Sequence, residues 1–448
     1  MSDFDLAKFH IPAPRYTSYP TIPEWENLSF ETYQDKLQKL PAEAPLSLYF
    51  HIPFCKTMCL YCGCAVVLNR KPENEELYVN YLIREIDLLT KITGRRKVFQ
   101  LHFGGGTPTK LSISLFSYLF DKITSAFDID FSKEIAIEID PRTVDDQKLR
   151  FLRNLGFNRV SFGVQDTNPK VQEAIKRRQS LEMTLETYKT ARMLGFKGIN
   201  IDLIYGLPYQ TLETFQKTIS DVITMRPDRI SLFSYAKVPW LKKHQRAIKP
   251  ETLPSFKEKF AIYDTAKKRL IENGYLAIGM DHFALEEDEI AQSFHQKRLG
   301  RNFQGYTTHL ADDMVGFGVT AIGCVCDTYV QNVKDLPSYY AAIDKGILPT
   351  HRGKVLTEED RLRKWVIHTL MSTFQLEKKT FESQYGRPFD LYFADEMTKL
   401  KELEAEGLLF NTSEKILITE LGILLIRVIA MTFDSYLKNG QNQFSQSI

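Results

Sequence analysis

Residues 51–64 read HIPFCKTMCLYCGC and hold four of the six cysteines of this 448-residue chain, namely Cys55, Cys59, Cys62 and Cys64. The stretch follows an apolar, β-rich run at residues 46–52, so we expect it to form the loop after a strand. Disulfide frameworks are typical of small secreted domains. Four cysteines so close together in a large chain therefore indicate metal or redox chemistry.

The first three cysteines have the spacing Cys-x3-Cys-x2-Cys. A structural zinc site is the alternative, but such sites usually take two separated cysteine or histidine pairs, and no second pair follows at finger-like spacing. Three thiolates at this spacing fit a cubane iron–sulfur cluster better, with one iron left open for chemistry. A fourth ligand would close that iron, so we expect Cys64 not to be a ligand. The other two cysteines lie in the apolar run 321–326, where we expect them to pack as small hydrophobic side chains.

Five more β-rich runs follow along the first half of the chain, at residues 98–103, 134–139, 159–164, 198–204 and 229–235. Amphipathic helical stretches separate them, most clearly at 211–225 behind a cap at Thr211. Six alternations of strand and helix imply right-handed crossovers and a parallel sheet, and therefore an α/β fold. A parallel barrel keeps its active site at the carboxyl ends of its strands. The residues at those ends are His51, Gly104, Glu138, Gln165, Asp202 and Ala236.

The third run alternates as a strand does. Ile135, Ile137 and Ile139 would share one face, which places Glu138 on the opposite face. A charged carboxylate inside a barrel is costly unless it meets a ligand or a partner. Glu138 is therefore a candidate site residue.

The chain is nearly neutral, with 58 Lys and Arg against 56 Asp and Glu, and 43% of its residues are apolar. This balance excludes a disordered chain, a collagen-like chain and a polybasic nucleic-acid binder. Residues 1–10 contain no apolar core of signal-peptide length, and the most apolar window, 416–433, is interrupted by Glu420, Gly422 and Arg427. We expect a cytoplasmic protein without a membrane segment, and an amphipathic core helix in that window.

The pattern changes near residue 345. A capping box at residues 357–360 begins a helix, and a second helix, two short β-rich runs and a last helix ending near Leu437 follow. This order resembles a winged helix, so a DNA-binding regulator is one alternative. Phosphate binding needs a basic face, however, and residues 351–448 hold 13 basic and 14 acidic residues. We expect an N-terminal arm over residues 1–40, a barrel with an extension over 41–345 and a mostly helical, winged-helix-like domain over 346–448.

The cysteine spacing resembles that of the radical S-adenosylmethionine (SAM) enzymes, which implies a partial (β/α)6 barrel. In that superfamily the open iron of a [4Fe-4S] cluster binds SAM, and an electron from the reduced cluster splits it into methionine and a 5′-deoxyadenosyl radical. The resemblance implies that Cys55, Cys59 and Cys62 are the cluster ligands. It implies no catalytic residue beyond the cluster and the SAM radical.

Motifs from about residue 14 to the C-terminus resemble those of the oxygen-independent coproporphyrinogen III oxidases, also called coproporphyrinogen dehydrogenases. They are RYTSYP (15–20), CGC (62–64), GGGTPT (104–109), GVQD (163–166), NIDLIYGLP (200–208), GMDHFA (279–284) and RNFQGYTT (301–308). The resemblance implies that two propionates of coproporphyrinogen III become vinyl groups, which gives protoporphyrinogen IX for haem at the expense of two SAM molecules. It also implies an electron donor such as flavodoxin or ferredoxin. We expect a monomer with no nucleic-acid partner.

The same resemblance implies two sets of cofactor contacts. The set for cluster-bound SAM is Tyr49, Gly105, Glu138 and Ile322. The set for a second SAM is Tyr61, Gly106, Thr107, Gln165, Arg177, Asp202 and Ala236, where the neighbouring Arg178 leaves a register slip of one residue open. A phosphate loop is the alternative for the glycines, but Thr109 replaces the third glycine of the dinucleotide pattern and the Walker Gly-Lys-Ser/Thr is absent.

The substrate carries four carboxylates, so its pocket should be basic although the chain is nearly neutral. Arg15, Tyr19, Gln304 and Tyr306 are candidate contacts, because the arm and a loop could cover the barrel mouth and exclude solvent. His51 stands four residues before Cys55 and either tunes the cluster through a hydrogen bond or packs as a structural histidine.

Two positions depart from the family pattern. Tyr61 stands where phenylalanine is more frequent, and Ala65 where asparagine is frequent. Two rival functions share the fold: a haem-binding chaperone and a haem-degrading radical methyltransferase. The chaperone relatives usually lack the RYTSYP arm and the cysteine at position 64, and both are present here.

Overall fold

The structure is a computed structural model that describes residues 6–303, 305–308, 313–437 and 444–447. The chain forms two compact units. The barrel unit consists of residues 26–274 and 309–355, and the composite unit of residues 1–25, 275–308 and 356–448. The arm, barrel and C-terminal segments expected from the sequence stay a prediction, and the composite unit draws residues from all three.

Six parallel strands in chain order form the centre of the barrel unit. They are β2 (Leu46–Ile52), β5 (Lys97–Gly105), β6 (Asp128–Ile139), β7 (Arg159–Gln165), β8 (Gly198–Tyr205) and β9 (Arg229–Ser234). Each of the six β-rich runs of the sequence is a strand, which confirms the expected α/β fold with its parallel sheet. The sheet continues beyond β2 through β14 (Asp313–Phe317), β15 (Ile322–Val325), β16 (Thr328–Asn332), β17 (Thr350–Val355) and β1 (Glu26–Asn27).

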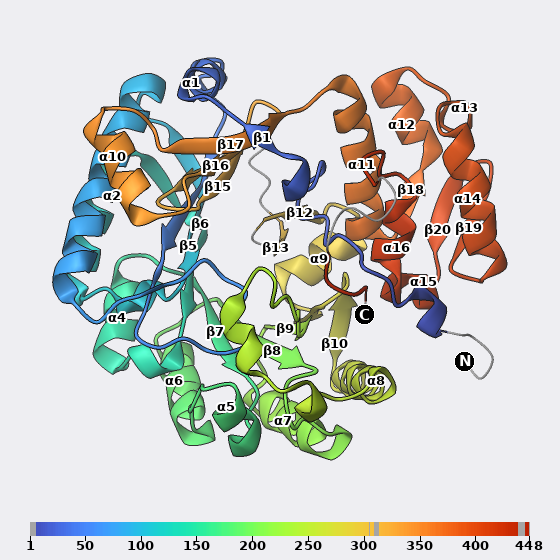
Figure 1. The fold of residues 1–448 in the computed structure, drawn as a ribbon, viewed down its shortest axis with the longest axis horizontal. Helices are drawn as coiled ribbons and strands as arrows, with labels where there is room; N and C mark the ends of the chain where they lie inside the picture. Colours follow the sequence, from blue (N-terminus) through green and yellow to red (C-terminus); the bar gives the residue numbers. More distant parts are fainter. Residues whose placement is uncertain (1–5, 304, 309–312, 438–443, 448) are drawn as a thin grey trace. The chain divides into compact units, whose positions relative to one another are not determined.

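Helices follow the strands and lie around the outside of the sheet, as α2, α4, α6 and α7 show in Figure 1. Thr211 caps α7 in a capping box with Thr214, as the sequence predicts for its start. The helices of the barrel unit are α1 (Phe30–Gln38), α2 (Pro72–Thr93), α3 (Ile113–Ala126), α4 (Asp146–Asn154), α5 (Pro169–Ala174), α6 (Leu181–Met193), α7 (Leu212–Met225), α8 (Phe256–Glu272) and α10 (Leu336–Asp344).

The sheet separates an apolar outer face from a polar inner face. The outer-face residues Ile135, Ile137 and Ile139 are at most 3% exposed, whereas the side chain of Glu138 is 46% exposed. Beneath the helices, Phe103 of β5 stacks on Phe50 of β2 with a centroid distance of 5.1 Å. The polar residues are thus held on the concave side by a rigid aromatic and aliphatic core.

In the composite unit, the N-terminal arm packs on the C-terminal helices. Tyr16 is buried and donates a hydrogen bond of 2.9 Å to Asp434. Arg427 is 7% exposed and donates to the carbonyls of Pro14 (3.0 Å) and Gln446 (2.8 Å). The composite unit holds β10 (Tyr275–Ile278), β11 (His282–Leu285), α9 (Glu289–His295), β12 (Gly300–Asn302), β13 (Gly305–Thr307), α11 (Glu358–Thr373), β18 (Gln375–Glu377), α12 (Lys378–Tyr385), α13 (Phe389–Tyr392), α14 (Ala394–Ala405), β19 (Leu409–Asn411), β20 (Lys415–Ile418), α15 (Glu420–Leu424) and α16 (Ile426–Met431).

The expected last helix is wrong in its extent. Residues 415–418 form β20 in a three-stranded sheet of order β18-β20-β19, and two short helices follow, the second ending at Met431 rather than near Leu437. The helical path breaks at Leu425, and Arg427 beyond it turns inward to bind carbonyl groups of both chain ends. The capping box at Thr357 begins α11 as expected.

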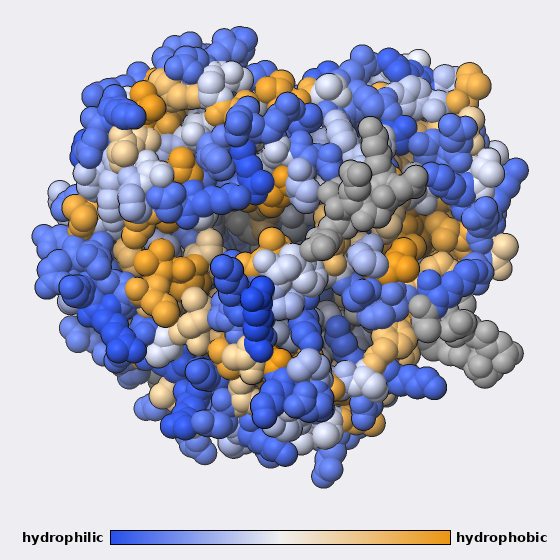
Figure 2. Space-filling model, in the orientation of Figure 1, coloured by the Kyte–Doolittle hydropathy of each residue, from blue (hydrophilic) through white to orange (hydrophobic). Residues whose placement is uncertain are grey.

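Within the described ranges, no helix is long and apolar enough to cross a membrane. On the face drawn in Figure 2, hydrophilic residues predominate and the apolar residues lie in separate patches.

Candidate active site

A cavity of about 570 Å³ opens at the carboxyl ends of the parallel strands of the barrel unit; it is called the site cavity below. The three cysteines expected as cluster ligands line it, and so do eight of the eleven expected cofactor contacts. Those eight are Tyr61, Gly105, Gly106, Thr107, Glu138, Gln165, Arg177 and Asp202. Residues that lie up to 147 positions apart in the sequence therefore meet in one place.

The cysteine loop is anchored to the strand ends by short backbone pairs. Cys55 belongs to the two-residue strand β3 (Phe54–Cys55), which pairs in parallel with β4 (Val67–Leu68). The Cys55 thiol lies 3.2 Å from the Thr107 hydroxyl. Cys55, Cys59 and Cys62 are all free thiols, so each is available as a ligand.

Burial and neighbouring thiols shift the acidity of the cysteines in opposite directions. Burial raises the pKa of Cys55 to about 11. A hydrogen bond from Cys64 lowers the pKa of Cys62, with help from Lys242 and His244, and correspondingly raises the pKa of Cys64. Cys64 thus acts on the neighbouring thiolate from an exposed position.

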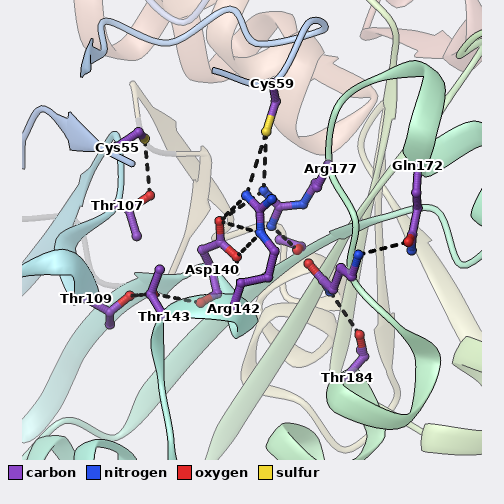
Figure 3. A network of polar contacts seen from close by, with 12 residues as sticks. Cys55, Cys59, Thr107, Thr109, Asp140, Arg142, Thr143, Gln172, Arg177 and Thr184 are labelled. Carbon is purple, nitrogen blue, oxygen red and sulfur yellow. Dashed lines mark hydrogen bonds and ion pairs between the residues drawn. The ribbon is translucent and has the colours of Figure 1, made fainter. Parts of the chain in front are cut away.

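Two arginines and one aspartate surround Cys59 (Figure 3). Nη1 of Arg177 and Nη2 of Arg142 each lie 3.8 Å from the Cys59 sulfur. Asp140 joins the two guanidinium groups, at 2.6 Å from Arg142 and 3.2 Å from Arg177. Although burial raises the pKa of Asp140, the two arginines hold it below its ordinary value. Two cations and one anion leave a positive excess, which favours thiolate ligands.

Neighbouring atoms of the protein itself require glycine at positions 104–106, independently of any cofactor. A Cβ atom on Gly106 would lie 2.5 Å from the Pro53 carbonyl oxygen, and Gly105 has a φ of +122°. The backbone amide of Gly105 donates to Glu138 at 3.2 Å. This close approach brings the β5 loop against the cysteine loop, and it would place backbone groups beside any cofactor in the cavity.

Polar contacts hold the parts of β7 and β8 that line the site cavity. Asp202 accepts a hydrogen bond of 3.0 Å from Ser161, and burial together with the charge of Glu138 raises the pKa of Asp202. Gln165 ends β7 with a φ of +69°, a conformation uncommon for a residue with a side chain. The next residue, Asp166, is fully buried and accepts from Gln210 at 2.6 Å and from Thr218 at 2.9 Å.

Three expected cofactor contacts, Tyr49, Ala236 and Ile322, are not part of the lining. Tyr49 lies on β2 with its hydroxyl 3.0 Å from Nδ1 of His51. Ile322 begins β15. These three residues stay predictions.

His51 connects Tyr49 to the cysteine loop. Its Nε2 donates to the Ala65 carbonyl at 3.0 Å, so Nδ1 accepts the Tyr49 hydroxyl. Burial lowers the pKa of His51, in keeping with a neutral ring. The contact at position 65 is made by the backbone, so it does not depend on the alanine that replaces the more frequent asparagine.

The expected substrate contacts in the composite unit have partners in that unit. Arg15 forms an ion pair with Asp281, the Tyr19 hydroxyl lies 2.9 Å from that of Ser435, and Tyr306 donates to the Met371 carbonyl at 3.0 Å. Gln304 lies outside the described residues. All four stay predictions as substrate contacts.

Known proteins match the chain over its full length. Residues 49–222 match the model of the Radical SAM superfamily, and residues 356–425 match that of the HemN C-terminal domain. The oxygen-independent coproporphyrinogen III oxidase of Synechocystis is 41% identical over 99% of this chain and 97% of its own, and that of Escherichia coli 42% over 100% and 99%. The chain belongs to the oxygen-independent coproporphyrinogen III oxidase family.

A solved structure of the family supports the assignment. The solved structure of coproporphyrinogen III oxidase (HemN) from Escherichia coli, a radical SAM enzyme, superposes with a TM-score of 0.93 and 41% identity, covering 97% of this chain and 99% of that one. The expected radical SAM fold is therefore confirmed, and membership implies a [4Fe-4S] cluster and SAM.

The residues of the site cavity fit the cluster that this coproporphyrinogen oxidase family implies. Among the described residues, no three His, Cys, Asp or Glu side chains are placed to hold a single metal ion. A cubane does not need such convergence, because each cysteine binds a different iron. The buried Nε atom of Arg177 has no hydrogen-bond partner in the described part of the chain, so a polar group remains for a ligand in the site cavity.

Several residues of this oxidase site were not among those predicted from the sequence. Asp140 and Arg142 line the site cavity, and Asp140 follows Glu138 by two positions, so the strand alternation that singled out Glu138 would put Asp140 on the same face. Residues 242–245 hold the cysteine loop from outside by donating hydrogen bonds to its backbone. Lys242 binds the Cys64 carbonyl (2.7 Å), His244 that of Cys62 (2.8 Å) and Gln245 that of Tyr61 (2.9 Å). No motif in the sequence signals this second segment.

Gln245 also holds the backbone of Ala236 beside the cysteine loop. Its amide donates to the carbonyls of both Tyr61 and Ala236, at 2.9 and 3.2 Å, and it is fully buried. Arg177 lines the site cavity, whereas Arg178 is exposed and pairs with Glu173. Of the two adjacent arginines, Arg177 is thus the one that lines the site cavity, and its contact with a cofactor stays a prediction.

Proposed function

We propose that this protein converts two propionate side chains of coproporphyrinogen III into vinyl groups without oxygen, giving protoporphyrinogen IX in haem biosynthesis. The observation that carries the proposal is the identity of 41–42% with coproporphyrinogen III oxidases over almost the whole length of both chains. Each propionate loses a hydrogen atom from its β-carbon, carbon dioxide and one electron. A carrier must accept that electron.

The [4Fe-4S] cluster and SAM, when bound, supply the radical that removes the hydrogen atom. Cys55, Cys59 and Cys62 would hold the cluster. Arg142 and Arg177 place positive charge beside the Cys59 sulfur, which offsets the negative charge that a reduced cluster adds. The carboxylate of Glu138 is available to accept hydrogen bonds from an ammonium or ribose group of SAM.

We also propose that two SAM molecules serve each turnover. Six of the seven residues expected around a second SAM line the site cavity, together with two of the four expected around the first. A reductant such as flavodoxin or ferredoxin completes the cycle. The monomeric state, the cytoplasmic location and the absence of a nucleic-acid partner stay predictions.

The proposal is tested by anaerobic assay of the reconstituted protein with coproporphyrinogen III, SAM and dithionite. We expect protoporphyrinogen IX and 5′-deoxyadenosine. The variant Cys59→Ala should lose the cluster absorbance and both products, whereas Cys64→Ala should keep the cluster. Cleavage of SAM without any porphyrin product, together with tight haem binding, would contradict the proposal and indicate the haem chaperone.

A further inference from the structure

A second hollow, called the basic hollow below, lies on the barrel unit beside the cysteine loop and has a volume of about 690 Å³. Its lining contains four cationic residues, Lys56, Arg70, Lys71 and Lys176, and no Asp or Glu. All four are exposed, and none of their side chains forms an ion pair with a carboxylate in the described part of the chain. Because the whole chain carries a net charge of +2, this accumulation is local.

The basic hollow and the site cavity share a wall. Lys56, Thr57 and Met58, the three residues between Cys55 and Cys59, line both of them. The expected cluster position and the basic hollow are thus separated by one short loop. A group seated in the basic hollow approaches the cluster without entering the cavity that SAM must occupy.

An apolar side chain in the lining of the basic hollow lies on the strand that pairs with Cys55. Leu68 lines the basic hollow and is 55% exposed. It is also the strand partner of Cys55, and the amide of Asn69 donates to the Cys55 carbonyl at 3.0 Å. Paired strands lie about 5 Å apart, so a molecule that contacts Leu68 comes within one strand spacing of a ligand residue.

We propose that the basic hollow is the docking site of a small acidic protein that delivers single electrons to the cluster. The inference rests on the proposed function, which requires one electron for each SAM cleaved. Four cations around an exposed leucine match a partner whose carboxylates surround an apolar, electron-bearing edge. Opposite charges steer such a transient encounter and orient it, and salt screens the attraction.

The test compares protein-mediated and chemical reduction in the full-length reconstituted protein. The variant Arg70→Glu/Lys71→Glu changes two exposed side chains that neither bind the cluster nor line the site cavity. Reduced flavodoxin is the limiting donor in one arm, and a saturating concentration of dithionite replaces it in the other. The readout is the rate of 5′-deoxyadenosine formation with coproporphyrinogen III present.

With flavodoxin at low ionic strength, we expect the second-order rate constant to fall about 10-fold or more in this variant, since mutants of one interface vary over one to three decades. The deficit should shrink at high salt, and the dithionite rate should equal that of the parent. A matched control, Lys189→Glu/Lys197→Glu, makes the same charge change at two exposed residues outside the basic hollow, on α6 and directly before β8, and should keep the parental flavodoxin rate.

Equal flavodoxin rates in the parent and the Arg70→Glu/Lys71→Glu variant would overturn the docking site. So would an equal deficit in the control variant, which would indicate an effect of overall charge. Absence of porphyrin product in the parent with dithionite would instead contradict the proposed function, so the two failures are distinguishable.

Discussion

Arg177 and Asp140 form a buried ion pair, with Nη1 and Oδ2 3.2 Å apart, beside the sulfur of Cys59. Asp140 also binds Arg142, so a single carboxylate keeps two like charges together beside Cys59, an expected cluster ligand. The ion pair therefore contributes both to the stability of the strand ends and to the charge of the site.

We predict that Asp140→Asn destabilises the protein by about 3–5 kcal/mol at neutral pH, because it leaves the buried guanidinium of Arg177 and the partly buried one of Arg142 without their shared carboxylate. The arginines lower the pKa of Asp140, so its contribution is present at neutral pH and is lost as the pH falls through that lowered pKa. Urea unfolding measures the loss. The exposed control Asp121→Asn should change stability by less than about 0.5 kcal/mol, and an equal effect of the two variants would contradict the account.

A second prediction concerns Gly106. Its added Cβ would meet a backbone carbonyl at 2.5 Å, which cannot move as a flexible side chain would. We expect Gly106→Ala to cost about 1–3 kcal/mol in the unfolding of the cluster-free protein. Gly63→Ala serves as the control, because nothing lies within 4 Å of its added Cβ. If both variants unfold at the parental urea concentration, the close approach of the two loops is not required.

A third prediction concerns pH. Glu85 of α2 is buried, and burial raises its pKa to about 7 although Tyr339, Gly318 and Asn332 donate hydrogen bonds to it. The folded protein holds this proton more tightly than the unfolded chain does. Stability should therefore fall by about 3 kcal/mol as the pH rises from about 4.5 to 7. Glu85→Gln should lack that decline.

The measurement for Glu85 is the urea midpoint of each variant at pH 5 and pH 8. Glu76→Gln, an exposed change on the same helix, should keep the parental decline. A parental slope in Glu85→Gln would show that other groups cause the pH dependence.

A fourth prediction separates the two roles of the cysteines in residues 55–64. Cys64→Ala removes the hydrogen bond that lowers the pKa of Cys62. Because Cys64 is not an expected ligand, we predict that iron binding persists but needs a higher pH for full cluster assembly, whereas Cys59→Ala loses the iron at every pH. Iron and sulfide content after reconstitution measures both. Loss of all iron in Cys64→Ala would make Cys64 a ligand.

The strands, and the position of the cysteines in the loop after the first strand, were predictable from the sequence because local rules fix them. The alternation of Ile135, Ile137 and Ile139 with Glu138 follows from the two-residue period of a strand, whatever the rest of the chain does. Arg427 shows the limit of such rules. As a charge in an apolar window it suggested only an interrupted helix, yet it binds carbonyl groups more than 400 residues away in the sequence.

The role of Gln245 was likewise not predictable from the sequence, because a single glutamine forms no motif. Only the fold brings it to the carbonyl groups of Tyr61 and Ala236. The basic hollow has the same origin: Lys56, Arg70 and Lys176 are scattered in the sequence and gather only in the folded barrel unit.

If SAM-derived radicals make both vinyl groups at this site, the stoichiometry of the products must reflect it. In an anaerobic reaction with limiting coproporphyrinogen III, we expect two molecules of 5′-deoxyadenosine for each protoporphyrinogen IX, with carbon dioxide released in the same two-to-one ratio. Formation of 5′-deoxyadenosine without protoporphyrinogen IX would contradict it.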